Sequence, residues 1–422
     1  MLRIVDNDGS ARKEADVGLR WMIVSMRESK RRRPVIIAVS ALLALVVIVA
    51  VSQHSPGDFR EPVPSKISPI LIQKDQDFDL EHGVIAGLGT ASDPYVIEGW
   101  AIDTSQGVCA VSPCAGITVR NVSASFIIRN VSIRGGHHDQ GIVLTGVGRT
   151  RVEGTKIAVG GEGIRVTSST NLTIVANVVT GSDEAVSLTG THGVSVAGNN
   201  VSKGGQGIVV KDSSQVTLDD NILSDNSANG MILSYVANST VEGNRITTSA
   251  FRAIVLFDSS DIIVSRNRIV GSGEECLYVI YGARNSIIEN EMSSCKWAGI
   301  SVKRSDDNVI SENSVAVTPR GIVLSESCGN LIARNHVANA TVSILVPSDC
   351  NIVMYGNVSG SAVREIDPCA AHSSASDCSY DATSRQEAYV WAIAHLSRLD
   401  ARRITPVETS VTQPRFSGFL VS

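Results

Sequence analysis

Six residues near the middle of the chain combine aromatic rings with charged groups at a regular spacing. Phe251, Glu274 and Trp297 are evenly spaced in the sequence, since each number exceeds the last by 23. Aromatic rings offer flat faces on which pyranose rings can stack, and charged side chains can bind hydroxyl groups or uronate carboxylates. The sequence therefore indicates a candidate carbohydrate-binding column, which comprises Phe251, Arg252, Glu274, Glu275, Trp297 and Arg320.

Two residues of this column are carboxylic acids and could support catalysis. If Glu274 and Glu275 lay about 5 Å apart, they could act as nucleophile and general acid in a retaining glycosidase. They are neighbours in the sequence, however, and could point to different sides. The alternative is a solvated turn that holds only an Arg–Glu ion pair and a scattered aromatic residue. Because no column supplies a dense set of Asp, Lys, Arg and His, no catalytic residue is assigned.

A smaller acidic group could bind a cation such as calcium through carboxylate oxygens, or could be an ordinary charged edge. This group comprises Asp139, Glu162, Asp183 and Glu184. No cysteine pair shows zinc-finger spacing with histidines. We therefore predict neither a bound metal nor a cofactor. Asp219 and Asp220 precede a periodic asparagine and are expected in a turn, and the isolated His192 is expected in a solvated turn.

The elements that position these residues are sequence repeats whose period is 22 or 23. Each repeat begins with a Gly/Ala-aliphatic-x-aliphatic pattern or a close variant, at Gly163, Ala185, Gly207, Gly230, Ala253, Cys276, Gly299, Gly321 and Ser343. An asparagine follows each start at a constant offset of 14, at Asn177, Asn199, Asn221, Asn244, Asn267, Asn290, Asn313, Asn335 and Asn357. Two columns that stay in phase in this way predict a solenoid whose coils stack in register.

Apolar residues alternate within each repeat, which predicts strands with one face directed inward. Ile208 and Val210 belong to the first strand of a repeat, whereas Val241 and Ile246 flank the asparagine of the second. Short Ser/Asp/Asn segments between them predict turns. This period is too short for paired helices, so the sequence predicts an all-β, right-handed parallel β-helix of about ten coils. The asparagines should form an inward ladder that satisfies polar groups at a bend.

The N-terminal residues predict export and membrane attachment. Residues 1–33 carry nine Lys or Arg and precede an apolar run from Val35 to Val51. A run of this length can span a bilayer, and basic flanks remain cytoplasmic. We expect a single-pass signal-anchor over residues 34–52, with the N-terminus inside and the bulk of the chain outside the cytoplasm; a cleaved signal peptide is the alternative. The net charge of −5 argues against nucleic-acid binding.

Flanking segments complete the predicted organisation. The expected parts are a linker and N-terminal cap at 53–115, repeats at 116–363, and a cap helix with a tail at 364–422. Ser384 and Glu387 form a capping-box start for that helix. The eight cysteines are even in number, as expected outside the cytoplasm. The close pairs Cys109/Cys114 and Cys369/Cys378 are expected to staple local loops.

The repeats resemble the NosD-like parallel β-helix repeat family, also described as carbohydrate-binding and sugar-hydrolase β-helices. The segment from Gly87 to Trp100, GLGTASDPYVIEGW, resembles the opening segment of archaeal cell-surface members. The resemblance implies the fold and a surface location. NosD itself is linked to copper-site maturation, but the chain has six Met and no Met-rich tract, and only His137-His138 is a conspicuous soft-metal feature. The Asn-Thr-Asp, Gly-His-Gly and Arg-x-Lys elements of polygalacturonases are lacking.

Two classes of function remain open from the sequence. The first is a membrane-anchored surface module that binds carbohydrate or acts as a scaffold, with the membrane contacted through residues 35–51 and polysaccharides or envelope glycans as partners. The second is a polysaccharide lyase, epimerase or glycoside hydrolase. The sequence favours the first class, since no set of catalytic residues is evident.

Overall fold

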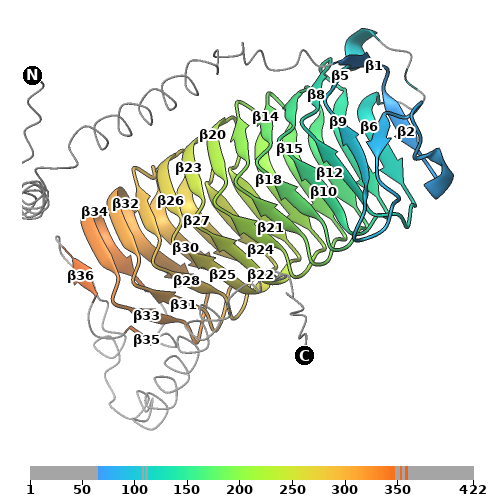
Figure 1. Cartoon of the computed structure of the whole chain (residues 1–422). Helices are drawn as coiled ribbons and strands as arrows, with labels where there is room; N and C mark the ends of the chain where they lie inside the picture. The colour runs from blue at the N-terminus through green and yellow to red at the C-terminus, as the bar shows by residue number, and fades with distance from the viewer. Residues whose placement is uncertain (1–64, 107–108, 110–112, 347–351, 354–356, 360–422) are drawn as a thin grey trace, which may run out of the picture. The chain divides into compact units, whose positions relative to one another are not determined.

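The computed structural model describes residues 65–106, 109, 113–346, 352–353 and 357–359, which form an elongated solenoid of short strands (Figure 1). Successive coils pair in parallel and in register, as Val186 with Ile208 and Ile208 with Met231 illustrate. Each regular coil contributes one strand to each of three stacks, which meet at bends. The parallel β-helix predicted from the repeats is therefore confirmed.

The first stack contains the strands that begin the repeats. They are β2 (Ile70–Ile72), β6 (Ala115–Arg120), β9 (Gln140–Thr145), β12 (Glu162–Thr167), β15 (Glu184–Thr189), β18 (Gln206–Lys211), β21 (Met231–Ser234), β24 (Ile254–Phe257), β27 (Glu275–Ile280) and β30 (Ala298–Lys303). These strands present alternate side chains to the core and to the outer surface.

The second stack follows the first bend of each coil. Its parallel strands are β4 (Tyr95–Glu98), β7 (Phe126–Arg129), β10 (Thr150–Glu153), β13 (Thr173–Val175), β16 (Ser195–Ala197), β19 (Thr217–Asp219), β22 (Ala237–Glu242), β25 (Ser260–Ser265), β28 (Ser286–Ile288), β31 (Val309–Ser311), β33 (Leu331–Ala333) and β35 (Ile352–Val353). At its N-terminal end β3 (Val84–Ala86) pairs with β4 in the antiparallel direction.

The third stack follows the periodic asparagines. Its strands are β1 (Ser65–Ile67), β5 (Trp100–Asp103), β8 (Ser132–Arg134), β11 (Lys156–Ala158), β14 (Val178–Thr180), β17 (Asn200–Ser202), β20 (Ile222–Asn226), β23 (Arg245–Ser249), β26 (Arg268–Ser272), β29 (Glu291–Ser293) and β36 (Val358–Ser359). The longer strands β32 (Ser314–Ser325) and β34 (His336–Leu345) continue around a corner into the first stack. Two short 3-10 helices, η1 (Asp75–Asp77) and η2 (Thr104–Gln106), are the only helices in the described residues.

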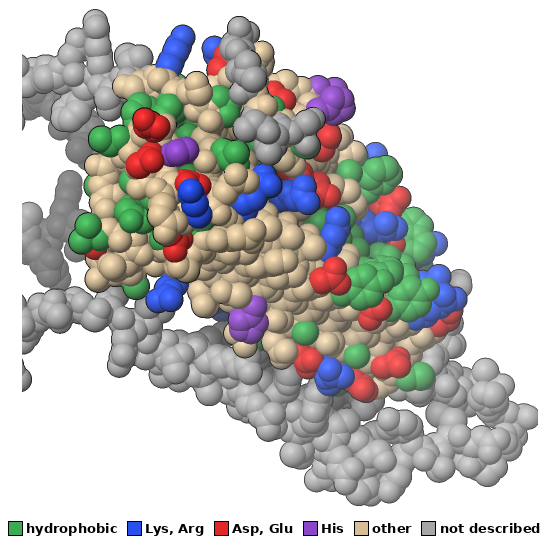
Figure 2. Space-filling model, turned by 90° about the vertical axis from the view of Figure 1, so that its right-hand side faces the viewer, with side chains coloured by type: hydrophobic (Ala, Val, Ile, Leu, Met, Phe, Trp, Pro, Cys, Tyr) green, Lys and Arg blue, Asp and Glu red, His purple; other side chains and the backbone are tan. Residues whose placement is uncertain are grey.

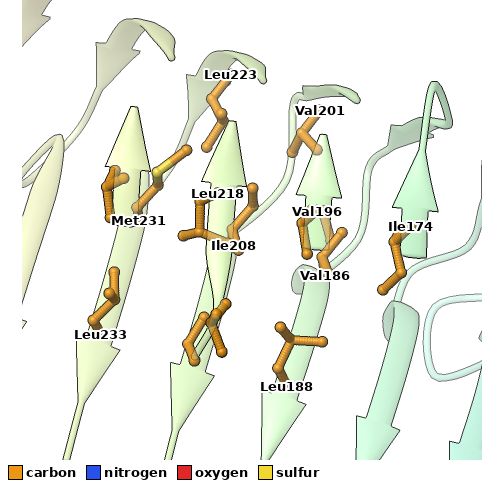
Figure 3. Packing of buried hydrophobic residues seen from close by; sticks show 14 of the residues in the cluster. Ile174, Val186, Leu188, Val196, Val201, Ile208, Leu218, Leu223, Met231 and Leu233 are labelled. Carbon is orange, nitrogen blue, oxygen red and sulfur yellow. The ribbon is translucent and has the colours of Figure 1, made fainter. Parts of the chain in front are cut away.

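Aliphatic side chains from successive coils fill the interior in columns. Val186, Ile208 and Met231 continue one column, and Leu188 and Leu233 belong to the next (Figure 3). All five are completely buried. Because like residues occupy like positions, each coil covers the core of its neighbour, which is the stacking that a repeat architecture requires.

The asparagine column forms the predicted inward ladder. Asn199 illustrates the pattern: its Nδ2 donates to the Oδ1 of Asn221 at 2.9 Å, and its Oδ1 accepts from both the backbone N and the Nδ2 of Asn177. The ladder begins at Thr155, whose hydroxyl donates to Asn177 Oδ1, and reaches Asn357. Each asparagine therefore bonds within the fold, to its neighbours in the ladder and to backbone groups.

A second asparagine ladder lies at the bend between the first and second stacks. The backbone N of Asn285 donates to Asn308 Oδ1, and Asn308 Nδ2 donates to Asn330 Oδ1 at 2.8 Å. Most earlier coils have a buried apolar residue at this position, as at Leu172, Val194, Val216 and Ile262, and one has the buried Ser239. The bend therefore changes from an apolar to an amide lining along the solenoid, and the sequence analysis missed this change.

Several predictions concern segments near the two ends of the chain. Within the segment predicted as linker and cap, β4 and β5 pair in parallel with β7 and β8, so stacking begins before Gly116. The predicted signal-anchor at 34–52 and the C-terminal helix lie outside the described residues. Within the part that the structure describes, no helix is long and apolar enough to cross a membrane.

Candidate functional site

The residues of the predicted aromatic column lie next to one another on successive coils, along the axis of the solenoid. The backbone N of Glu274 donates to the carbonyl O of Phe251 at 3.0 Å, and the backbone N of Trp297 donates to that of Glu274 at 3.1 Å. Both rings are about half exposed, at 48% for Phe251 and 46% for Trp297. The column therefore lies on the surface, at the corner that leads into β24, β27 and β30.

This corner is one residue longer here than in the flanking coils. Ala253 follows Asn244 by nine positions, whereas Gly207 follows Asn199 by only eight. The longer corner occurs before Gly230, Ala253, Cys276 and Gly299. Since the asparagine ladder continues unbroken past these coils, the extra residue is accommodated within the corner itself.

Both glutamates of the column contact the same arginine. Arg252 Nη2 lies 2.6 Å from Glu274 Oε2, and Arg252 Nε donates to Glu275 Oε2 at 2.6 Å. The possibility that the two carboxylates point to different sides is therefore not realised. One guanidinium therefore engages both groups, and each carboxylate is held in an ion pair with Arg252.

Tyr278 completes this cluster and was not identified from the sequence. The Arg252 Cζ atom lies 4.6 Å from the centre of the Tyr278 ring, a cation–π contact. Burial and the nearby Glu275 carboxylate raise the pKa of Tyr278, so the phenol remains protonated at neutral pH and can donate a hydrogen bond. The paired positions on adjacent coils are Val255 and Ser301, so no periodic pattern marks this residue.

Arg320 differs from Arg252 in its surroundings. Its Cζ atom lies 4.9 Å from the centre of the Trp297 ring. No carboxylate pairs with it among the described residues, and it is half-buried rather than extended into solvent. A guanidinium held against an aromatic ring without an acidic partner can bind a carboxylate or sulfate of a ligand.

One disulfide and one side-chain hydrogen bond link the segments that carry the column. A disulfide joins Cys276 to Cys295, both fully buried, with Cα atoms 5.5 Å apart. Cys276 directly follows Glu275, and Cys295 lies two residues before Trp297. Ser272 Oγ lies 2.6 Å from the carbonyl O of Phe251. The disulfide therefore ties together the two segments that carry the charged and aromatic groups.

The disulfides agree in part with the sequence analysis. The predicted pair Cys109–Cys114 is present, whereas Cys276–Cys295 was missed because Cys276 was assigned only as a repeat start. The proposed pair Cys369/Cys378 lies outside the described residues.

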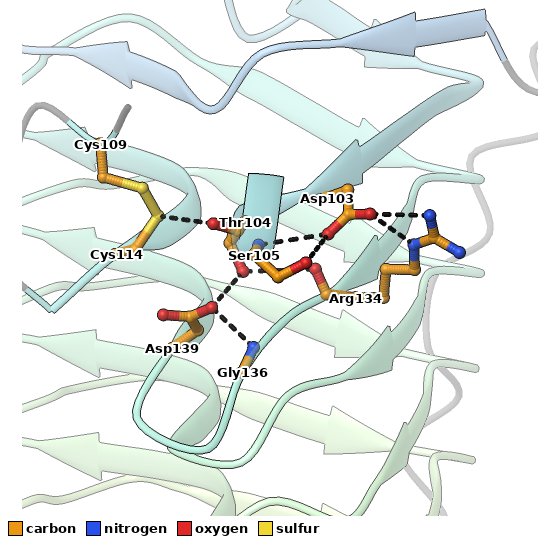
Figure 4. Close-up of a disulfide and its surroundings, with 8 residues drawn as sticks. All are labelled: Asp103, Thr104, Ser105, Cys109, Cys114, Arg134, Gly136 and Asp139. Atoms are coloured by element: carbon orange, nitrogen blue, oxygen red, sulfur yellow. Dashed lines mark hydrogen bonds and ion pairs between the residues drawn. A yellow bond between two sulfur atoms is a disulfide. The ribbon is translucent and has the colours of Figure 1, made fainter. Parts of the chain in front are cut away.

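Three of the four acidic residues proposed for calcium bond within the protein, and the fourth, Asp183, is exposed. Asp139 Oδ2 accepts from Thr104 Oγ1 at 2.7 Å and from the backbone N of Gly136 (Figure 4). Glu162 pairs with Arg165, and Glu184 lies 3.5 Å from Lys211. No cluster of three or more metal-ligating side chains occurs among the described residues. These carboxylates thus act as loop and surface partners in the structure.

His192 and Asp219 both lie in turns or at strand ends, away from the column. His192 Nδ1 is 3.0 Å from Ser214 Oγ on the next coil. Asp219 ends β19, where burial raises its pKa and the neighbouring Asp220 carboxylate raises it further. A group with a raised folded-state pKa stabilises the fold fully below its ordinary value of 3.8 and loses that contribution as the pH rises through the folded-state pKa.

We expect Asp219→Asn to raise the Tm by about 1–2 °C at neutral pH and to leave it unchanged near pH 3, because the neutral amide removes the cost of ionising this carboxyl. Thermal unfolding followed by circular dichroism at several pH values measures this effect. Asp212→Asn, at an exposed turn, is the control. A lower Tm for Asp219→Asn at neutral pH would contradict the assignment.

Three stacks of parallel strands joined by inward ladders define a parallel β-helix. Two family models match the chain, "Periplasmic copper-binding protein (NosD)" over residues 117–294 and "Right handed beta helix region" over residues 237–379. Over these residues the chain matches NosD-like right-handed β-helix proteins. Comparison with curated protein sequences gives no match.

Solved structures with a similar fold include two enzymes. The A-module of mannuronan C-5 epimerase AlgE6 from Azotobacter vinelandii has 12% sequence identity to this chain and a TM-score of 0.56. The match covers 70% of this chain and 90% of the AlgE6 module. DFA-IIIase from Arthrobacter chlorophenolicus without its lid has 16% sequence identity and a TM-score of 0.51. The match covers 70% of this chain and 86% of the DFA-IIIase chain. At such identities the likeness establishes the fold alone.

The described residues do not fit a copper site, although the family description names copper. Soft-metal binding requires His, Cys or Met groups that converge. Met231 and Met292 are buried in the core, and the described cysteines form disulfides. The rings of His137 and His138 stack on each other at 4.9 Å, without the further ligands that a metal cluster needs in this part of the structure.

Proposed function

We propose that this protein is an exported, membrane-anchored β-helix that binds polysaccharide through the column of Phe251, Arg252, Glu274, Trp297 and Arg320. The observation that carries the proposal is the pairing of two half-exposed rings on one vertical column with an arginine that lacks an acidic partner among the described residues. Rings that recur along the solenoid suit the repeating pyranose units of a chain. The anchor at residues 34–52 would hold this surface at the cell envelope.

Arg320 indicates the kind of saccharide that the column would accept. Arg252 is neutralised by two carboxylates, so Arg320 is the guanidinium of the column that is left for a ligand. We expect acidic polysaccharides, which carry carboxylate or sulfate groups, to bind more tightly than neutral ones. The mannuronan C-5 epimerase of similar fold is consistent with a saccharide ligand.

The test is binding of the purified full-length protein to acidic and neutral polysaccharides, with new reducing or unsaturated ends measured in parallel. We expect Trp297→Ala to weaken binding about tenfold, roughly 1.4 kcal/mol, because the stacking face is lost. Leu88→Ala, which removes an exposed side chain far from the column in the sequence, should have no effect. Unchanged binding in Trp297→Ala would refute the site.

A polysaccharide lyase, epimerase or hydrolase is the second candidate. The protonated phenol of Tyr278 beside Glu275 and Arg252 is the observation that favours it. New saccharide ends that disappear in both Tyr278→Phe and Glu275→Gln would assign an enzyme. Binding without new ends would leave the protein a binding module.

A further inference from the structure

A second set of aromatic and charged residues lies at the opposite border of the first stack. Tyr235, Asp258, Tyr281 and Arg304 occupy the same position on four successive coils, directly after β21, β24, β27 and β30. Backbone hydrogen bonds run through these turns, from Asp258 N to the carbonyl O of Ile280 at 2.9 Å, for example. With Phe257 they form a continuous surface that we name the tyrosine border.

The rings of the tyrosine border contact one another in a fixed arrangement. The centres of the Tyr235 and Phe257 rings are 5.6 Å apart, and those of Phe257 and Tyr281 are 5.8 Å apart. Both pairs are edge-to-face, with interplanar angles of 78° and 81°. Tyr235 is 55% exposed and Tyr281 is 45% exposed. The border therefore holds two exposed rings on either side of a third.

Polar groups alternate with these rings. The exposed carboxylate of Asp258, between the two tyrosines, has no hydrogen bond or ion pair in the described part of the chain. Arg304 Nη1 donates to the Tyr281 hydroxyl at 2.9 Å, and Arg304 Nε donates to Glu326 Oε2 at 2.6 Å. Exposed rings with an acceptor between them and a positioned hydroxyl can contact the apolar face and the hydroxyl groups of a sugar.

The backbone conformation at the tyrosine border does not favour bulky side chains, so the fold alone does not require tyrosines there. Tyr235 and Tyr281 both have φ of 57°, in the left-handed region. Bulky residues pay about 1–2 kcal/mol there, and glycine pays almost nothing. Gly146 and Gly190 occupy the same turn in other coils, with φ of 62°.

The tyrosine border repeats the arrangement of the first column. Each has an aromatic residue, a carboxylate and an aromatic residue at one position of three successive coils, and an arginine on the fourth. Arg304 keeps that position, whereas Arg320 pairs with Ala298 and lies one residue beyond the column of Phe251, Glu274 and Trp297. The two arrangements are separated by the length of the strands, about 20 Å for six residues of extended chain. Exposed hydrophobic side chains are interspersed with charged ones along one side of the solenoid in Figure 2.

We propose that the tyrosine border is a second saccharide-binding site, which takes the pyranose units of a separate glycan strand running along the solenoid. Tyr235 and Tyr281 stack on sugar faces, and Asp258 accepts from hydroxyl groups. Because the two sites lie about 20 Å apart on one sheet, the protein holds two strands side by side and links them. This goes beyond the proposed function, which requires only one site.

The experiment is calorimetric titration of the full-length protein with hexagalacturonate and cellohexaose, combined with thermal unfolding. We expect two molecules of at least one hexasaccharide to bind per chain. The double variant Tyr235→Asn/Tyr281→Asn should retain one, and should keep or raise its Tm, since asparagine tolerates the left-handed turn better than tyrosine. Ser168→Asn, at the same turn in a distant coil, is the matched control and should retain both.

The outcomes distinguish this site from the first. Loss of one binding event in the tyrosine variant, with Trp297→Ala unaffected, would support the tyrosine border and refute the first column. Loss of one event in each variant supports both sites. No binding of either probe, unchanged stoichiometry in the tyrosine variant, or a clearly lowered Tm that marks the tyrosines as structural would overturn the inference.

Discussion

Asn199→Ala is expected to lower the free energy of unfolding by about 3–5 kcal/mol, because it leaves several buried polar groups without partners. The backbone N and Nδ2 of Asn177 lose their acceptor, and the carbonyl O of Ile174 loses a donor at 3.0 Å. Asn221 Oδ1 loses the Nδ2 donor of Asn199 but still accepts from the backbone N of that position. Urea denaturation and amide hydrogen exchange measure the loss, which should be concentrated in the coils next to Asn199.

Asn200→Ala is a closely matched control, since the same substitution is made one residue further along the chain. Asn200 is exposed and its side chain is not part of the ladder. We expect a change within about 0.5 kcal/mol. Equal effects of the two substitutions would mean that the ladder contributes no more than a surface amide.

Replacing both Cys276 and Cys295 by Ala should have the second large effect. The disulfide closes a loop with a sequence separation of 19, for which chain entropy gives about 3 kcal/mol of stabilisation. We also expect weaker polysaccharide binding, because Glu275 and Trp297 lose the link that fixes their segments. Denaturant unfolding and calorimetric binding on the same samples separate the two effects.

The control is Cys109→Ala/Cys114→Ala. That disulfide spans a separation of only five residues and does not adjoin the column. It should cost less stability, about 2 kcal/mol, and should leave saccharide binding unchanged. Weakened binding in this control alone would place the ligand at the N-terminal coils instead.

The solenoid could be predicted because each core position is repeated. A buried column such as Val186, Ile208 and Met231 needs an apolar residue on every coil, so its period survives in the sequence. The column of Phe251, Glu274 and Trp297 was found by the same reasoning, since in-register stacking places equivalent positions of successive repeats next to each other. Whether that column binds saccharide stays a prediction.

Features that occur on a single coil left no such signal. Tyr278 lies between Val255 and Ser301, so nothing in the period singles it out. The Cys276–Cys295 disulfide joins two positions of one coil across a bend, a distance that the period does not encode. The tyrosine border was missed for a different reason: its residues recur with the period of the repeats, but turns were expected to hold only small polar residues.

The longer corner beside the first column has a consequence for how this surface could diversify. Four coils carry one more residue there, while the ladder that follows keeps its hydrogen bonds. Length changes at this point therefore do not propagate into the rest of the molecule. Such a corner is a natural insertion point, where ligand preference could be altered by lengthening one loop, or a new loop grafted, with the scaffold left intact.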